Sequence, residues 1–256
     1  MKRLMILFVA AVATSPLWAI QGTIRTETDS KKGDIKWQSR SKSYAISFKK
    51  GNTVVSAEYP LADVVELDIE KPAGYDKAVE NVKRGNGAAA IGVLTKIVQD
   101  YKMLKWDKPA GRYLVEAYIS ANNAQKAFEV ASGIVNEDKS AAWKGDLAPA
   151  YWQALLKLGK TQQLEGLVKK AAISGDRAAS ANALVMRGDM ILASEGASPE
   201  GLRKALTDAY LRVVLMYADE PCREARIDAM QRAATCFDKL GQAARAEQLR
   251  SQARKL

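Results

Sequence analysis

Histidine is absent from this chain of 256 residues, and cysteine occurs only twice. Without histidine, the chain lacks the commonest general base near neutral pH and the commonest protein ligand for zinc. The serine–histidine and cysteine–histidine pairs of nucleophilic enzymes are excluded for the same reason. We therefore expect a protein that is not an enzyme and that has no metal or organic cofactor.

Two glycine-containing strings resemble phosphate-binding loops but lack the necessary context. Residues 85–90 match the G-x-G-x-x-A spacing, yet a helical pattern precedes them where a dinucleotide site needs a strand. Gly159-Lys160-Thr161 resembles the end of a P-loop, but Ala154 stands where that loop has its first glycine. Both strings therefore read as turns next to helices.

Long hydrophobic runs are scarce, and the one that matters lies at the N-terminus. Lys2 and Arg3 precede an apolar run at 4–13, and a plausible cleavage region follows at 15–19, Ser-Pro-Leu-Trp-Ala. This order is typical of a cleaved secretory signal, and the run is shorter than the roughly 20 residues that span a bilayer. We predict a signal peptide at 1–19, cut after Ala19 or, alternatively, after Ala13.

Export follows from that signal, to the periplasm or beyond the cell. No cysteine follows the apolar run, so a lipoprotein anchor is not expected. No later segment is apolar for long enough to span a membrane, so the mature chain should have no integral membrane segment.

The two cysteines are not expected to form a disulfide. Cys222 and Cys236 lie in one predicted helix, where their Cα atoms would be about 21 Å apart. A disulfide needs about 4.4–6.8 Å. Cys236 lies on the apolar stripe of that helix, and Cys222 is the cysteine expected to be exposed.

The charge is positive but spread along the chain. The formal net charge is +10, and without Lys2 and Arg3 there are 37 basic against 29 acidic residues. Basic and acidic residues number 9 and 8 in 20–72, 17 and 13 in 73–199, and 11 and 8 in 200–256. Nucleic-acid-binding proteins usually concentrate their basic residues, so no nucleic acid partner is expected. Attraction to anionic polymers remains open.

Residues 20–72 read as a small β module. Apolar and polar residues alternate at 22–26, 34–37, 43–48, 53–59 and 64–69, with turn residues between these runs. Five short strands predict a bent antiparallel barrel of the SH3 or Sm-like kind. A flat meander packed on the first helices is the alternative.

From residue 73 to 256 the apolar period changes to that of helices, so the predicted fold class is α+β, mainly α. About five helix pairs are expected, which together would form an α-solenoid. The predicted pairs are 75–84 with 88–104, 110–121 with 124–137, 147–158 with 161–173, 177–194 with 199–218, and 222–240 with 243–255.

A weak internal repeat supports these pairs. Predicted helices end at Asn122, Gly159 and Gly241, residue types that tolerate the left-handed conformation at a helix C-terminus. An apolar residue follows each of them five positions later, namely Ala127, Leu164 and Ala246. The spacings of 37 and 82 residues fit one and two units of a helix-pair repeat of roughly 34 to 47 residues.

The last pair is similar to a known family. Tyr210-Leu-Arg-Val-Val-Leu-Met-Tyr217 followed by Pro221, Phe237, Gly241 and 246–249 resembles the tetratricopeptide repeat, especially the divergent form in exported bacterial envelope proteins. The likeness is close over 205–256 and looser over 75–176. The tryptophan near the start of a typical repeat is missing from this pair, so the superfamily is better supported than a subfamily.

The resemblance implies a scaffold that binds a protein or peptide along a concave side lined by the first helix of each pair. Candidate contacts are the polar or aromatic residues of those helices that lie off the apolar stripes: Arg112, Glu116, Trp152, Gln153, Asn182, Arg187, Arg226 and Gln231. Trp152 has two readings, a groove residue or packing on a neighbouring repeat.

The expected function is thus an exported scaffold for a protein or peptide partner in the cell envelope. The alternative is binding of an envelope polymer, peptidoglycan or an acidic polysaccharide, through the basic surface or the β module. Neither the identity of the partner nor the oligomeric state follows from the sequence.

Overall fold

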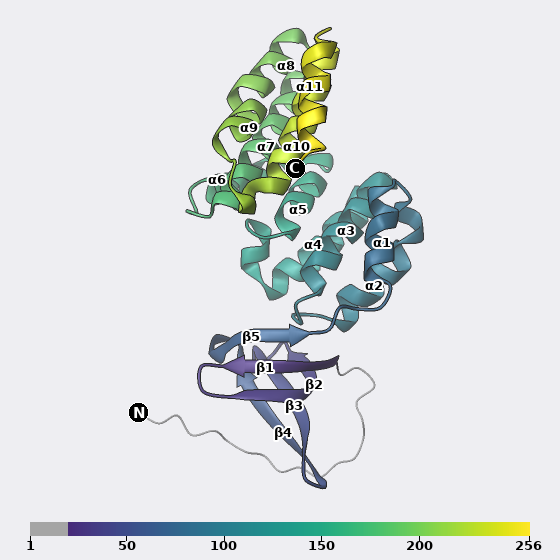
Figure 1. The fold of residues 1–256 in the computed structure, drawn as a ribbon, viewed down its shortest axis with the longest axis vertical. Coiled ribbons are helices and arrows are strands. Elements are labelled where there is room, and N and C mark those ends of the chain that lie inside the picture. Colours follow the sequence, from purple (N-terminus) through teal and green to yellow (C-terminus); the bar gives the residue numbers. More distant parts are fainter. Residues whose placement is uncertain (1–19) are drawn as a thin grey trace. The chain divides into compact units, whose positions relative to one another are not determined.

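The computed structural model of this chain describes residues 20–256, so the predicted signal peptide lies outside the described residues. The chain divides into two compact units, which we call unit 1 (residues up to Ala121) and unit 2 (Asn122–Leu256). An antiparallel sheet begins the described chain, and helices follow it to the C-terminus (Figure 1). Within 20–256, no helix has the length and apolar character needed to cross a membrane.

The β module of unit 1 contains the five predicted strands, most of them slightly longer than expected. They are β1 Ile20–Thr26, β2 Ser30–Gln38, β3 Ser43–Lys50, β4 Thr53–Pro60 and β5 Val64–Ile69, with a 3-10 turn η1 at Leu61–Asp63. Alternation of side chains along each strand buries one face of the sheet.

The strand order is β4-β3-β2-β1-β5, so the last strand returns to pair with the first. This order differs from the flat meander, in which β5 would lie beside β4. A flat sheet would separate its two edges by about 19 Å, whereas the step from Pro60 to Val64 spans at most about 14 Å. The sheet therefore has to curl, and β4 and β5 are its edges.

The core of the β module is completed by a loop from the helical part of unit 1. Ile24, Ile35 and Ile46 are buried together with Met103 and Leu104. The latter two residues belong to the loop between α2 (Ile91–Asp100) and α3 (Asp107–Ser120). The sheet and this loop therefore share one hydrophobic core.

Hydrogen bonds hold the same loop in place. The Tyr44 hydroxyl donates to the carbonyl of Met103 at 3.0 Å, and Trp106 Nε1 donates to the carbonyl of Ile69 at 3.0 Å. The backbone N–H of Met103 donates to the buried carboxylate of Asp107 at 2.8 Å. Met103 has a φ of 58°, a costly conformation for a residue with a side chain, and these bonds to both sides of it offset that cost.

The helices follow the predicted pairs. Unit 1 also contains α1 Tyr75–Lys83 and the 3-10 turn η2 Gly87–Ala89, so the glycine-rich string at 85–90 does follow a helix. Unit 2 contains α4 Ala124–Glu137, η3 Lys139–Ala142, α5 Leu147–Lys157, α6 Thr161–Ala172, α7 Arg177–Glu195, α8 Pro199–Ala205, η4 Leu206–Tyr210, α9 Leu211–Met216, η5 Glu220–Cys222, α10 Arg223–Lys239 and α11 Ala243–Ala253. The helix expected at 199–218 is interrupted by η4, a π-helical turn.

The predicted turn anchors are confirmed. Asn122, Gly159 and Gly241 have φ values of 57°, 65° and 73°. The residue five positions after each anchor is completely buried: Ala127, Leu164 and Ala246 each have 0% exposure. The repeat read from the sequence is therefore a repeat of backbone conformation and of packing.

The expectation for Cys222 is wrong. Cys222 is completely buried in the core of unit 2, because the 3-10 turn η5 directs its side chain into that core before α10 begins. Cys236 is buried as well, and both cysteines are free. Burial raises the pKa of the Cys222 thiol to about 11, so neither position offers a reactive thiolate at neutral pH.

Candidate functional site

The two candidates in unit 1 are paired with each other. Arg112 and Glu116 lie one turn apart on α3, and Arg112 Nε donates to Glu116 Oε1 at 3.0 Å. The Arg112 guanidinium also lies 5.2 Å from the centre of the Tyr113 ring. Both side chains are half-buried, so this pair presents a small polar surface in which the charges largely offset each other.

Trp152 is a core residue, which is the second of its two readings. Its side chain has no exposed surface, and its Nε1 donates to the carbonyl of Ala142 at 2.8 Å. This hydrogen bond holds the 3-10 turn η3 against α5. In this conformation Trp152 offers no surface to a partner.

The main polar cluster of unit 2 is centred on Asp189, which the sequence analysis missed. Asp189 Oδ1 accepts hydrogen bonds from Arg232 Nη1 and from the Tyr210 hydroxyl, both at 2.7 Å. Asp189 Oδ2 accepts from Gln153 Nε2 at 2.5 Å. We call these four residues the Asp189 cluster.

The Asp189 cluster joins successive first helices. Gln153 is on α5, Asp189 on α7 and Arg232 on α10, and each is the first helix of its pair. Asp189 is buried, whereas Gln153 and Arg232 are half-buried and extend from the core to the surface. One carboxylate thereby bonds to three helical segments besides its own, which fixes the spacing of α5, α7 and α10.

Gly188 and the π-helical turn make this arrangement possible. A Cβ at Gly188 would lie 2.3 Å from Tyr210 Cε1, so only glycine lets the tyrosine ring rest against α7. The π turn η4 ends at Tyr210, whose ring has no exposed surface. Burial, followed by the charge of Asp189, raises the pKa of Tyr210 far above its ordinary value, so its hydroxyl is a permanent donor.

The remaining candidates are divided between different faces of their helices. Asn182 lies seven residues before Asp189, which places it on the same face of α7. Arg187 lies about 160° around that helix from Asp189, and Arg226 about 120° around α10 from Arg232, at 100° per residue. Gln231 is exposed, but it lies 100° around α10 from Arg232, beside Arg250 and Arg254 at the α11 side. The face that carries the Asp189 cluster therefore includes Gln153 and Asn182 but excludes Arg187, Arg226 and Gln231.

A second candidate site lies in the β module, and no sequence signal marked it. A cleft of about 1060 Å³ is lined by the end of β4, the β1–β2 turn and the segment from η1 to β5. Its lining includes Thr26–Asp29, Ser41, Ser43, 56–60, Ala62, Asp63 and Val65. We call it the β4 cleft. The strands were predictable, but the cleft depends on how the sheet curls, and periodicity does not report that curl.

Within 20–256 no three acidic or cysteine side chains lie close enough to hold a metal ion. The groups on hand are carboxylates, hydroxyls, amides and guanidinium groups, which suit the binding of polar or charged partners through hydrogen bonds and ion pairs.

Comparison with known proteins gave fold-level similarity alone. No protein-family model and no curated protein matches the chain. Two crystal structures from Podosopora anserina, one of them of a point variant, contain nearly identical TPR-like repeats of a protein described as a kinesin light chain. They align at 15% identity over 72% of this chain and 92% of theirs, with TM-scores of 0.42 and 0.41. Similarity at that level says nothing about a partner.

Proposed function

We propose that this protein is an exported, non-enzymatic scaffold that binds a protein or peptide partner in the cell envelope. The binding face would be the one that carries the Asp189 cluster on α5, α7 and α10. The observation that carries the proposal is the bridge across three successive first helices through one buried carboxylate. Helices held at fixed spacing lose little freedom when a partner binds, which favours affinity.

The sequence resemblance of 205–256 to the tetratricopeptide repeat supports the same role. Repeats of that family generally bind partners along their first helices. The absence of histidine, of exposed thiols within 20–256, and of an acidic cluster that could hold a metal there is compatible with a binding role.

Site-specific photo-crosslinking in the producing cell tests the proposed face. A photo-reactive residue at Asn182 is expected to capture one partner of defined mass. Arg187 is the matched control, because it lies on the same helix as Asn182 but on another face. Glu165 on α6 and Gln248 on α11 are exposed controls on second helices. Equal capture at all of these positions would contradict a binding face on the first helices.

Export is part of the proposal and has its own test. The basic residues and apolar run within 1–19 support secretion with cleavage. The mature protein should begin near Ile20 and be recovered in the periplasm or the medium. N-terminal sequencing that finds Met1 on protein from a membrane pellet would contradict it.

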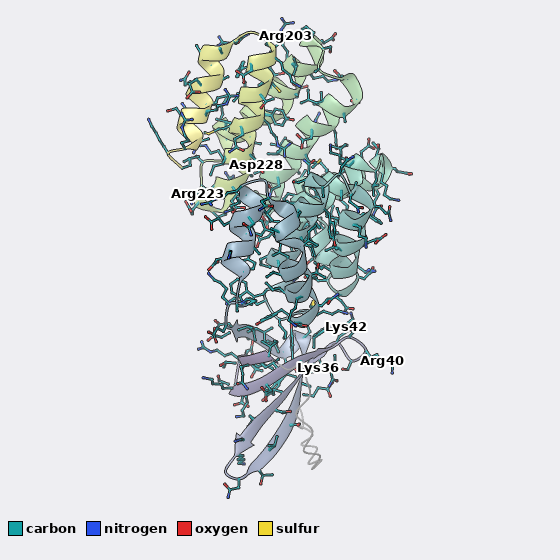
Figure 2. The ribbon with its side chains drawn as sticks, turned by 90° about the vertical axis from the view of Figure 1, so that its right-hand side faces the viewer. Lys36, Arg40, Lys42, Arg203, Arg223 and Asp228 are labelled. Atoms are coloured by element: carbon teal, nitrogen blue, oxygen red, sulfur yellow. The ribbon has the colours of Figure 1, made fainter. Side chains whose placement is uncertain are left out.

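The alternative, binding of an anionic envelope polymer, is supported by one feature of the β module. Lys36, Arg40 and Lys42 surround the turn between β2 and β3 (Figure 2). Lys42 Nζ lies 5.9 Å from the centre of the Trp37 ring. Retention on peptidoglycan or an acidic polysaccharide should fall steeply as salt is raised, and a Lys36→Gln, Arg40→Gln variant should lose it. Retention that is independent of salt and of this variant would exclude the alternative.

We also propose that the β module is of the SH3 or Sm-like kind. The return of β5 to β1 and the 3-10 turn before β5 support this assignment. An experimental structure of unit 1 would test it through the closure of the sheet between β4 and β5.

A further inference from the structure

One edge of the sheet in the β module has free backbone groups. Within residues 20–256, β4 pairs with β3 alone, and the N–H of Leu61 donates to the carbonyl of Lys42 at 2.9 Å. Because hydrogen-bonded pairs alternate in an antiparallel ladder, Ala57 and Tyr59 bond to β3. Ser56 and Glu58 therefore direct their N–H and C=O groups away from the sheet.

This free edge lines the β4 cleft. Residues 56–60 line it together with the β1–β2 turn, the segment from Ala62 to Val65, and Gln38, Ser41, Ser43 and Ala45 of the β2–β3 hairpin. The hydroxyl of Tyr59 donates to Asp29 Oδ2 at 3.2 Å, which links the edge strand to the β1–β2 turn. Exposed strand edges are usually blocked by lysine, proline or a covering segment. Here Pro60 ends the edge, and the stretch before it opens onto a cleft of about 1060 Å³.

The charge of the cleft is opposite to that of the chain. Glu27, Asp29, Glu58 and Asp63 line it, and no lysine or arginine of the described part of the chain does, although residues 20–72 contain nine basic residues. Lys31 pairs with Asp29 at 2.7 Å from outside this lining, so part of the charge is offset.

Two of these carboxylates, Glu58 and Asp29, are ionised at neutral pH. Hydrogen bonds from Ser43 and Ser41 lower the pKa of Glu58, and those from Lys31, Ser30 and Tyr59 lower the pKa of Asp29. The cleft therefore combines backbone groups that accept an added strand with fixed negative charge beside them.

We propose that the β4 cleft binds an extended cationic peptide, which adds to β4 as a further strand. Main-chain hydrogen bonds to Ser56 and Glu58 would supply affinity, and the four carboxylates would select lysine and arginine side chains. A second copy of this chain is the less suitable occupant. Its own free edge, β5, carries Glu66 and Asp68, which would meet the carboxylates of the cleft. This site is separate from the proposed helix face.

Peptide binding to the full mature chain tests the proposal. The probe is a fluorescein-labelled nonapeptide that alternates lysine and threonine, measured by fluorescence anisotropy. Replacing its lysines with glutamate is expected to abolish binding, and raising the salt concentration should weaken it. Two further peptides carry N-methyl groups on alternate amides, one on the odd positions and the other on the even positions. Only one of these sets of amides faces β4 in an added strand, so only one of the two peptides should bind more than 10-fold more weakly.

Two substitutions on β4 make a matched pair. Ser56→Pro removes an N–H that the β3–β4 ladder does not use, so the sheet should persist while peptide binding falls more than 10-fold. Val54→Pro removes an outward N–H on the same edge beyond the cleft and should leave binding unchanged. Ser56→Ala controls for the loss of the side chain, and Glu58→Gln with Asp63→Asn should weaken binding without changing the fold.

Three results would overturn the proposal. The first is equal affinity for the lysine and glutamate peptides, and the second is equal weakening by both N-methyl registers. The third is a concentration-dependent dimer that Ser56→Pro abolishes, because it would identify a second copy as the occupant. If Ser56→Pro unfolds the β module, the comparison of the two N-methylated peptides on the wild-type protein still tests whether the peptide adds to β4. Crosslinking at Asn182 is read separately, so failure of either site is distinguishable from failure of the other.

Discussion

Unit 1 and unit 2 are stabilised in different ways. In unit 1, residues from the sheet and from the loop at 101–106 form one core, so segments far apart in the sequence depend on each other. In unit 2, helices that follow each other in the chain pack together, as α6 does with α7 and α10 with α11. Stability in unit 2 should therefore be more local, as in helical repeats, whereas unit 1 should fold only as a whole.

The largest expected effect comes from removing residues 20–72. Met103 and Leu104 would then be exposed, so α1–α3 should lose helicity or the chain should aggregate. Residues 122–256 produced alone should remain helical. Circular dichroism and hydrogen exchange of both fragments measure the difference. A fully helical, soluble 73–256 fragment would show that the β module and the helices are independent.

Gly188→Ala should cause the largest loss from a single substitution. The added Cβ would lie 2.3 Å from Tyr210, whose ring is held by the hydrogen bond to Asp189. Overpacking outweighs the better helix propensity of alanine, and we expect a loss of about 2–3 kcal/mol in the free energy of unfolding. Urea denaturation measures it. Gly166→Ala on α6, where a Cβ meets nothing within 4 Å, is the control and should be neutral or stabilising.

Ala246→Leu tests how local unit 2 is. Ala246 is completely buried on α11, so leucine should force α10 and α11 apart and cost about 1–3 kcal/mol. Hydrogen exchange should rise in 199–256 and stay unchanged in 20–72. Uniform loss of protection would instead indicate one indivisible core, and no change at all would mean that position 246 tolerates a larger side chain.

Tyr44→Phe tests the shared core of unit 1 more gently. It removes the hydrogen bond to the carbonyl of Met103 while keeping the ring, so a loss of about 1 kcal/mol is expected. Faster exchange of amides in both the sheet and the α2–α3 loop is the specific signature. Changes confined to the sheet would argue against coupling.

The smallest effect is a pH dependence that differs in sign between the units. Burial raises the pKa of Asp107 in unit 1, so its contribution is largest below its unfolded pKa and is lost as pH rises through the folded value. The hydrogen bond from Arg177 lowers the pKa of Asp219 in unit 2 to about 2, so its contribution is present above 3.8 and lost as pH falls.

Stability measured against pH for the two asparagine variants resolves these signs. Relative to Asp107→Asn, the wild type should gain stability on acidification. Relative to Asp219→Asn, it should lose stability. If the stability curves of the wild type and a variant run parallel against pH, the replaced aspartate is not the source of the pH dependence.

Of the candidate binding residues, sequence reasoning found those that depend on helix periodicity. Gln153 and Asn182 do lie on the face of the Asp189 cluster, because position on a helix follows from spacing, whereas Gln231 lies beside α11. Asp189 and Arg232 were missed, since nothing local marks an aspartate that accepts bonds from residues 36 and 43 positions away. The glycine before Asp189 was the available signal, because a helix interior rarely favours glycine without a packing reason.

The five strands, the helix pairs and the turns at Asn122, Gly159 and Gly241 could be predicted from sequence, because periodicity and left-handed conformations are properties of neighbouring residues. Three features could not: the return of β5 to β1, the completion of the β-module core by the loop at 101–106, and the cleft along β4. These features depend on contacts between distant segments, such as that of Tyr44 with Met103. The free energy that stabilises these contacts comes from apolar surface that two distant segments bury together, and neither segment shows this surface by itself.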